Sequence, residues 1–137
     1  MIGVVIVAHG GLAREYLAAV EHVVGHQDGV RAIAIGPEDD RALKQREICD
    51  AADAVDTGDG VVVVTDMFGG SPSNLSLRAC NPRNRRILYG ANLPLLIKLA
   101  KSRHKPVGDA VAAAMEAGRK YIDSQIVGED LGRAVGL

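Results

Sequence analysis

Residues 61–74 have the sequence VVVVTDMFGGSPSN. Its first five residues are all β-branched and uncharged, which is typical of a strand buried on both faces of a parallel sheet. Asp66 and a glycine-rich loop follow directly, and the pair Ser71-Pro72 is typical of the opening of a short helix. A buried strand, a polar loop and a helix in this order form the repeating unit of an α/β fold.

The same alternation of strand and helix continues on both sides of this stretch. A second buried strand is predicted at residues 2–8, and weaker strands are predicted at 32–35 and 87–89. Apolar spacing, prolines and glycines predict helices at residues 12–24, about 39–55, 72–80, 94–102 and 107–122. We therefore predict a three-layer α/β/α fold with a mostly parallel sheet in the order 2-1-3-4.

A short apolar segment, Ile126-Val127, follows the last predicted helix. It reads as a C-terminal antiparallel strand that has no obvious partner within one copy of the chain. An unpaired strand edge invites pairing with another chain, and exchange across a two-fold axis removes that edge. We therefore expect a homodimer in which this strand is exchanged between subunits.

Length and composition describe one globular domain. The chain has 137 residues, of which 47% are hydrophobic and 24% charged, and its net charge is −1. The balanced charge, together with the absence of tryptophan, argues against nucleic-acid binding. We expect no secretory leader and no membrane insertion, and therefore a cytoplasmic protein with reduced thiols. The expected core covers residues 1–127, and a tail follows at 128–137.

Two residues that suit nucleophilic catalysis follow neighbouring strands of the predicted sheet. His9 comes directly after the first strand, and Asp66 comes directly after the third. The carboxyl ends of these strands form the crevice in which α/β folds collect their ligand chemistry. An aspartate that hydrogen-bonds one imidazole nitrogen leaves the other nitrogen with a free lone pair, as a histidine nucleophile requires.

The rest of the loop after Asp66 predicts a phosphate site. Gly69 and Gly70 allow close approach of the backbone to a ligand, and Ser71 is expected to cap the following helix. Backbone N–H groups around Gly70 to Ser73 would then bind phosphate, together with the Ser71 hydroxyl. The loops at 9–11, 66–74 and 90–93 contain no Lys or Arg, so the phosphate would be held by neutral donors. This combination predicts phosphoryl transfer through a phosphohistidine, without metal or other cofactor.

Other polar residues are expected to be structural. His22 and His26 have the spacing of a metal pair but no third ligand nearby, so they are expected at the solvated surface. His104 is expected at a polar helix end, and Cys49 and Cys80 are expected as small core or near-core side chains. Solvated positions are expected for Arg83, Arg85 and Arg86, and docking of an acidic partner is the alternative.

Three motifs in order resemble one known family. They are His9 after the first strand, DMFGGSPSN at 66–74 after the third, and GANLPLL at 90–96 after the fourth. Together they resemble the EIIA domain of the mannose family of the bacterial phosphoenolpyruvate:sugar phosphotransferase system (PTS), over residues 1 to about 127. The chain would then be a single EIIA domain and a protein-histidine phosphotransferase.

The resemblance implies specific partners and roles. The domain would accept a phosphoryl group from the phosphocarrier HPr on His9 and pass it to an EIIB protein. Asp66 would orient the ring, the Ser71 loop would cradle the phosphate, and a strand near Ile126 would be exchanged in a homodimer. The partners would contact a rim around the site, which we assign to Gly10, Gly11, Phe68 and Asn92.

Two departures from the family pattern concern the partners. Similar domains often carry tryptophans where this chain has Gly11 and Phe68, so the sugar-specific partner is left open. No fused EIIB domain follows in this sequence, so we expect either a separate EIIB partner or a regulatory role.

Three other classes of protein are alternatives to this function. The phosphoryl-donor subunit of a dihydroxyacetone kinase also uses a histidine after the first strand. A histidine phosphatase or mutase usually gathers an arginine and a second histidine, which these loops lack. A flavodoxin-like or receiver-like binding module would need a hydroxyl-rich first loop or acidic residues in place of His9.

Overall fold

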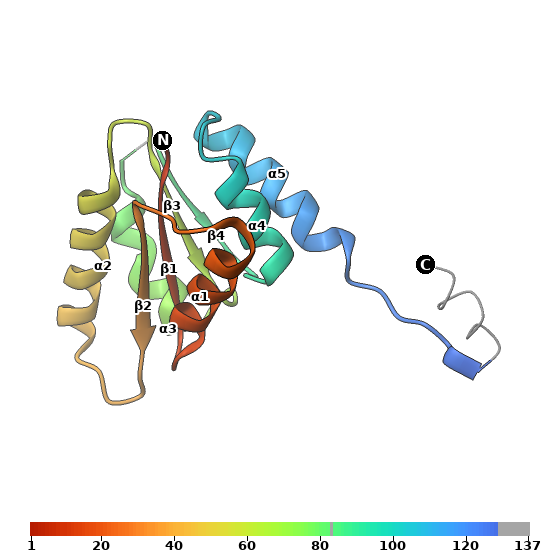
Figure 1. The fold of residues 1–137 in the computed structure, drawn as a ribbon. Helices are drawn as coiled ribbons and strands as arrows, with labels where there is room; N and C mark the ends of the chain where they lie inside the picture. The colour runs from red at the N-terminus through yellow and green to blue at the C-terminus, as the bar shows by residue number, and fades with distance from the viewer. Residues whose placement is uncertain (83, 129–137) are drawn as a thin grey trace.

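Four parallel strands form the central sheet of the computed structural model (Figure 1), which describes residues 1–82 and 84–128. The strands are β1 (Gly3–His9), β2 (Val30–Ile35), β3 (Val61–Thr65) and β4 (Arg85–Leu88). Their order across the sheet is β2-β1-β3-β4, and each neighbouring pair runs parallel. The α/β class, the parallel sheet and the strand order predicted from the sequence are confirmed.

Helices cover both faces of this sheet. They are α1 (Leu12–Val24), α2 (Arg41–Val55), α3 (Ser71–Ser76), the 3-10 helix η1 (Leu77–Cys80), α4 (Leu93–Lys101) and α5 (Val107–Lys120). The predicted helix at 72–80 is thus α-helical only in its first part and tightens to a 3-10 helix at Leu77. In the described parts of the chain, no helix has the length and apolar character needed to cross a membrane.

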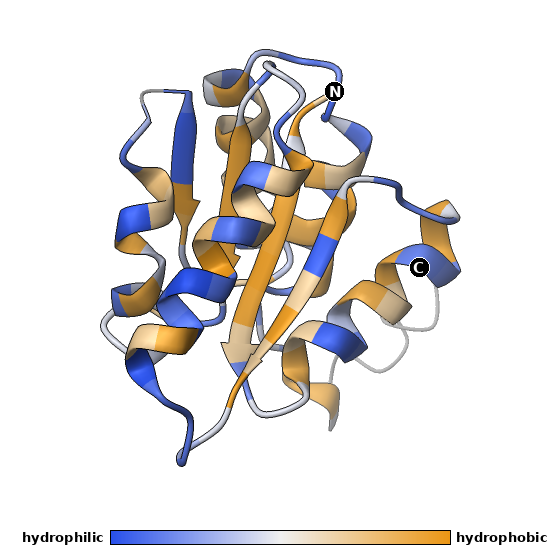
Figure 2. Ribbon diagram, turned by 90° about the vertical axis from the view of Figure 1, so that its left-hand side faces the viewer, coloured by the Kyte–Doolittle hydropathy of each residue, from blue (hydrophilic) through white to orange (hydrophobic). Residues whose placement is uncertain are grey.

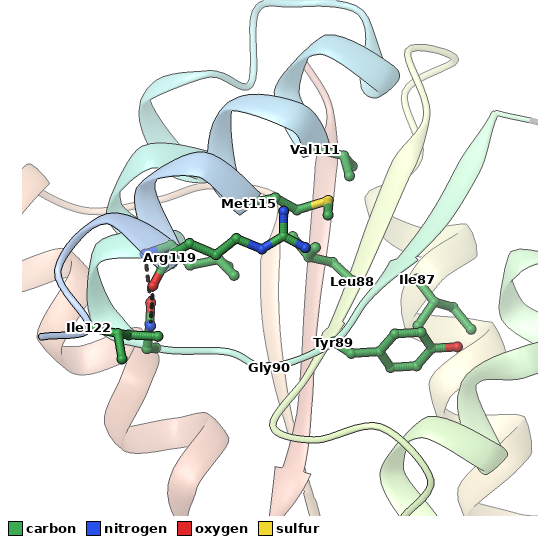
Figure 3. Close-up of a pocket in the computed structure, with 11 residues that line it drawn as sticks. Ile87, Leu88, Tyr89, Gly90, Val111, Met115, Arg119 and Ile122 are labelled. Atoms are coloured by element: carbon green, nitrogen blue, oxygen red, sulfur yellow. Dashed lines mark hydrogen bonds between the residues drawn. The ribbon is translucent and has the colours of Figure 1, made fainter.

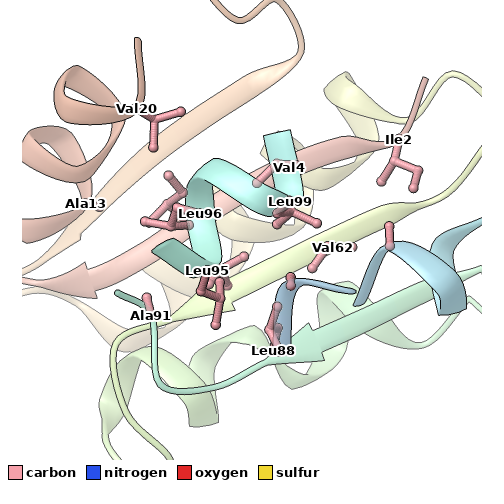
Figure 4. Close-up of a cluster of buried hydrophobic side chains, with 14 of the residues drawn as sticks. Ile2, Val4, Ala13, Val20, Val62, Leu88, Ala91, Leu95, Leu96 and Leu99 are labelled. Carbon is pink, nitrogen blue, oxygen red and sulfur yellow. The ribbon is translucent and has the colours of Figure 1, made fainter. Parts of the chain in front are cut away.

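Alternate residues of β1 enter two separate hydrophobic cores. Val4 and Ile6 pack with residues of α1, α4 and α5 (Figure 4), whereas Val5 and Val7 pack with residues of α2 and α3. Figure 2 shows hydrophobic central strands between helices whose surfaces carry many hydrophilic residues. Strand β1 is buried along its length and emerges at the surface only at its last residue, His9.

Two helices differ in detail from the sequence-based expectation. Helix α2 begins at Arg41 because the Asp40 carboxylate accepts a hydrogen bond from the Leu43 N–H at 3.0 Å. The buried stripe of α1 is narrower than its apolar residues suggest. Val20 is buried and Val24 packs against the core, whereas Val23 is 54% exposed.

Arg85 ties three elements together at the amino end of the sheet. Its guanidinium donates hydrogen bonds to Asp53 Oδ1 at 2.8 Å, to Asp56 Oδ2 at 3.1 Å and to the Ala79 carbonyl at 3.0 Å. Arg85 is buried, so the expectation of a solvated charge was wrong for this residue, because carboxylates distant in the sequence surround it. Arg86 is exposed as expected, and Arg83 lies outside the described residues.

Replacing Arg85 by glutamine should lower the free energy of unfolding by about 2–3 kcal/mol, since Asp56 would lose its charged donor. Hydrogen bonds from the Gly58 N–H and from Arg85 hold the pKa of Asp56 below its usual range. A lowered folded-state pKa stabilises the fold at neutral pH, and this stabilisation is lost as the pH falls below about 4. Chemical denaturation should therefore show a difference in the free energy of unfolding between wild type and variant that is smaller at pH 3 than at pH 7. An equal difference in the free energy of unfolding at both pH values would contradict this account.

Beyond α5 the chain leaves the body as an arm, residues 121–128 (Figure 1). Residues 122–126 have no regular secondary structure, so the predicted strand at Ile126-Val127 is not formed within the single chain. The apolar side chains of the arm are exposed, Ile122 at 75% and Ile126 at 78%. Of the predicted tail at 128–137, only Gly128 is described, and strand exchange between subunits stays a prediction.

Candidate active site

His9 is the last residue of β1, and its side chain leaves the buried strand for the surface. Gly10 follows in the left-handed region with φ of +56°, and its N–H donates to the Ile35 carbonyl at 2.9 Å. This turn directs the chain from the sheet into α1 within two residues. The His9 side chain is 48% exposed, so the site is shallow and open to large molecules.

Asp66, which follows the neighbouring strand β3, holds His9 at two points. Its Oδ2 accepts a hydrogen bond from the backbone N–H of His9 at 3.0 Å and lies 2.7 Å from Nδ1 of the ring. Parallel strands end at the same edge of a sheet, and for that reason the structure brings together the two residues that the sequence analysis singled out. The Asp66 side chain is only 10% exposed.

The protonation states of this pair follow from their hydrogen bonds. Burial acts to raise the pKa of Asp66, but the hydrogen bonds from the backbone and the ring of His9 outweigh it and hold that pKa below its usual range. Asp66 is therefore ionised at neutral pH and only accepts hydrogen bonds. In the neutral form of the His9 ring, a proton on Nδ1 can be donated to Asp66 Oδ2, and the free lone pair then lies on Nε2.

The glycine-rich loop after β3 touches the free side of the ring. A Cβ atom built on Gly70 would lie 3.1 Å from Cε1 and 3.4 Å from Nε2 of His9. Gly69, which precedes it, has a φ of +88°. Glycine at position 70 thus lets the backbone approach Nε2 of His9 more closely than a side chain would allow.

Helix α3 begins one residue earlier than expected. Gly70, not Ser71, is the N-cap, because its extended backbone presents the carbonyl that accepts the first helical bond from Asn74 N–H at 3.1 Å. Ser73 supplies the contact that a capping side chain would make. Its Oγ accepts from the Gly69 N–H at 3.0 Å and donates to the Gly70 carbonyl at 3.2 Å. Ser71 is the first helical residue, and Ser73 is buried and supports the loop from inside.

The residues expected at the rim differ in their surroundings. Gly10 and Gly11 are exposed, and Phe68 is 74% exposed. Asn92 is occupied within the fold, because its Oδ1 accepts from Leu95 N–H at 3.0 Å and its amide donates to the Gly118 carbonyl at 2.9 Å. Asn92 therefore joins the start of α4 to the end of α5.

Tyr89 is a rim residue that sequence reasoning missed. Its ring meets the Phe68 ring edge to face with centroids 5.1 Å apart, and the residue is 37% exposed. An aromatic residue directly after the last strand, at the carboxyl edge of the sheet, was the available signal. The sequence pattern alone predicts Tyr89 as the last residue of a strand.

The remaining candidates lie elsewhere and have structural surroundings. Both ring nitrogens of His26 face carboxylates, Glu21 and Asp28, at 2.9 Å, and His22 is exposed. Among the described residues, no cluster of three or more metal-ligating side chains occurs. Cys49 in α2 and Cys80 in η1 are half-buried and pack against the same core, and burial raises the pKa of Cys80 to about 11.

Comparison with known proteins identifies the family. The model of the EIIA-man family, described as the PTS system fructose IIA component, matches residues 3–116. The chain belongs to the EIIA-man family. The matched range includes His9, Asp66 and the whole 66–74 loop. The resemblance to the mannose-family EIIA domain of the phosphotransferase system is therefore confirmed.

A curated relative and two solved structures agree with this assignment. The PTS system mannose-specific EIIAB component of Escherichia coli K12 is 30% identical over 125 residues, covering 88% of this chain and 38% of that protein. This EIIA chain thus spans well under half of that relative. A phosphotransferase system EIIA component from Streptococcus agalactiae superposes with a TM-score of 0.76 at 26% identity, over 90% of this chain and 97% of that one. The PTS IIA protein associated with the fucose utilization operon of Streptococcus pneumoniae gives a TM-score of 0.75 at 27% identity, over 94% and 95%.

Proposed function

We propose that this EIIA protein accepts a phosphoryl group from phospho-HPr on Nε2 of His9 and passes it to an EIIB protein in the cytoplasm, for sugar uptake or for regulation. The observation that carries the proposal is the double contact of Asp66 Oδ2 with His9, which keeps the proton on Nδ1 and leaves Nε2 as the nucleophile. The half-exposed ring suits donors and acceptors that are themselves proteins.

In the acceptance step, the lone pair of Nε2 forms a bond to phosphorus while the bond between phosphorus and the donor breaks. The imidazole gains positive charge as the new bond forms, and the Asp66 carboxylate, 2.7 Å from Nδ1, stabilises that charge. The Nδ1 proton stays on the ring throughout. In the donation step the acceptor takes the phosphoryl group, and the imidazole returns to its neutral form.

Neutral groups of the 69–71 loop are proposed to hold the phosphoryl oxygens. The backbone at Gly70 lies against the ring of His9, and N–H groups at the start of a helix have no intrahelical partner. The hydroxyl and N–H of Ser71 complete this set. Ser73 contributes by holding Gly69 and Gly70 in place, since its hydroxyl is already engaged by both.

A methyl group at position 70 should slow phosphorylation of His9 by about 10²-fold, because it would displace the ring or cover Nε2. The Gly70→Ala variant tests this in single-turnover transfer from phospho-HPr. Gly108→Ala is the matched control, since its added methyl group would meet only Arg86, at 3.8 Å. Equal transfer rates for both variants would show that the Gly70 contact has no part in the reaction.

The experiment that tests the proposed function is incubation of the purified protein with phosphoenolpyruvate, the general phosphotransferase enzyme and HPr. We expect one phosphoryl group per chain, labile in acid and stable in base, as for a phosphorus–nitrogen bond. Omission of HPr should prevent labelling. An unlabelled protein in the complete mixture would refute the proposal.

We also propose that the protein is a homodimer in which the arm of each subunit pairs with β4 of the other. Strand β4 lies at the edge of the sheet, and the apolar arm is exposed in the single chain. In the Ile126→Asp variant, a charge replaces a side chain that is 78% exposed in the monomer, so the monomer fold should be unaffected. Light scattering at micromolar concentration should show a dimer for wild type and a monomer for this variant. A monomeric wild type would refute the dimer.

A further inference from the structure

A groove of about 390 Å³ lies between β4 and α5, and its lining residues include Tyr89 and Asn92 (Figure 3). Apolar residues such as Leu88, Val111 and Met115 line much of it. Tyr89 and Gly90 continue the lining toward the loop that follows β4. In Figure 3, Leu88 points toward α5, whereas Ile87 and Tyr89 point to the other side of the sheet.

The arm described above has the pattern of a strand that would fit this edge. In an extended conformation, Ile122, Ser124 and Ile126 lie on one face, and Tyr121, Asp123, Gln125 and Val127 lie on the other. A strand paired with the free edge of β4 would therefore place two isoleucines in the groove under α5, and it would place Tyr121 and Val127 on the side of Ile87 and Tyr89. The arm of a second copy of the chain is therefore the segment that would occupy this groove.

Tyr89 belongs both to this edge and to the rim of the active site. Its ring contacts Phe68 edge to face at 5.1 Å, and Phe68 is 74% exposed, so few other contacts orient Phe68. The loop that carries Tyr89 is anchored on both sides. The Ala91 N–H donates to the Thr65 carbonyl at 3.0 Å, and Asn92 donates to the Gly118 carbonyl at 2.9 Å, near the root of the arm.

From this arrangement we propose that Tyr89 is a positioning residue that couples subunit assembly to partner docking. The arm of the second subunit packs on Tyr89, and Tyr89 in turn holds Phe68 in the orientation that phospho-HPr contacts. The inference rests on the function and the dimer proposed above, and adds a link between them. It predicts that loss of the arm contact and loss of the Tyr89 ring have the same consequence at the rim.

The test compares four variants in transfer from phospho-HPr, with KM and kcat measured separately and the subunit state checked by light scattering. Tyr89→Ala should raise KM about fivefold, the size expected of one aromatic contact, with kcat unchanged because His9 and Asp66 are untouched. Tyr89→Phe keeps the ring and should behave as wild type. Ile126→Asp should raise KM to a similar extent, and the Tyr89→Ala/Ile126→Asp double variant should show no further increase.

Any other result refutes either the coupling or the proposed function. An unchanged KM in Tyr89→Ala, or a double variant in which the two increases multiply, would refute the coupling while the protein is still labelled on His9. A dimer that persists in Ile126→Asp would place the arm elsewhere and refute the coupling as well. A wild-type protein that takes up no phosphoryl group would instead refute the proposed function itself.

Discussion

The His9→Ala variant is expected to take up no phosphoryl group at all. Nε2 of His9 is the proposed nucleophile, and the substitution removes the whole imidazole ring. The variant should fold, because the removed side chain is half exposed and follows the buried part of β1. Transfer of radioactive phosphate from phosphoenolpyruvate, followed on denaturing gels, measures the loss, and circular dichroism checks the fold.

The other histidines provide matched controls for this result. His22, His26 and His104 are exposed, and their alanine variants should be labelled to the wild-type extent. Label that survived in His9→Ala and moved to one of these histidines would overturn the assignment of the nucleophile.

The Asp66→Asn variant should transfer the phosphoryl group about 10³-fold more slowly than wild type. The amide lacks the charge that stabilises the imidazolium form of His9. The amide also cannot reproduce both the contacts of Oδ2 with His9 and the surroundings of the buried Oδ1. With its oxygen facing His9, the amide nitrogen takes the place of Asp66 Oδ1, which is buried and has no hydrogen-bond partner among the described residues. With its nitrogen facing His9, it opposes the backbone N–H and favours the ring tautomer protonated on Nε2.

Rapid-quench measurement of a single turnover separates this effect from partner binding. Asp28→Asn is the matched control, since Asp28 contacts a histidine, His26, at 2.9 Å in an exposed position. We expect wild-type rates for the control. Equal rates for both variants would mean that Asp66 serves only as a turn residue.

The main architecture and the central pair of the site could be predicted from the sequence, because both follow from local patterns and one topological rule. Uncharged β-branched runs mark the buried strands, and adjacent parallel strands end at one edge, which places His9 beside Asp66. Features that depend on tertiary contact could not be predicted in the same way. The carboxylates around Arg85 are 29 and 32 residues away in the sequence.

Local sequence preferences, such as the preference for serine as an N-cap, also failed close to His9. Serine is a better N-cap than glycine, yet Gly70 takes that position because the backbone there lies against the ring of His9. Ser73 then supplies the hydroxyl from two residues further on than expected. Asn92 was expected to face partners, but its amide closes the contact between α4 and α5. The edge-to-face pair of Phe68 and Tyr89 joins two loops, and the sequence of neither loop by itself indicates this contact.

The lack of lysine and arginine in the loops at 9–11, 66–74 and 90–93 determines how long a phosphoryl group would stay. Under the proposed function, a group carrying about two negative charges is attached to a ring that also contacts the ionised Asp66. A fixed cation would lower the energy of this state and delay the departure of the group. Without one, the domain would hold the phosphoryl group with no strong preference over the donor or the acceptor, and its phosphorylation level would follow the supply from the donor and the demand from the acceptor. Such a domain would need no adjustment to the chemistry of the sugar.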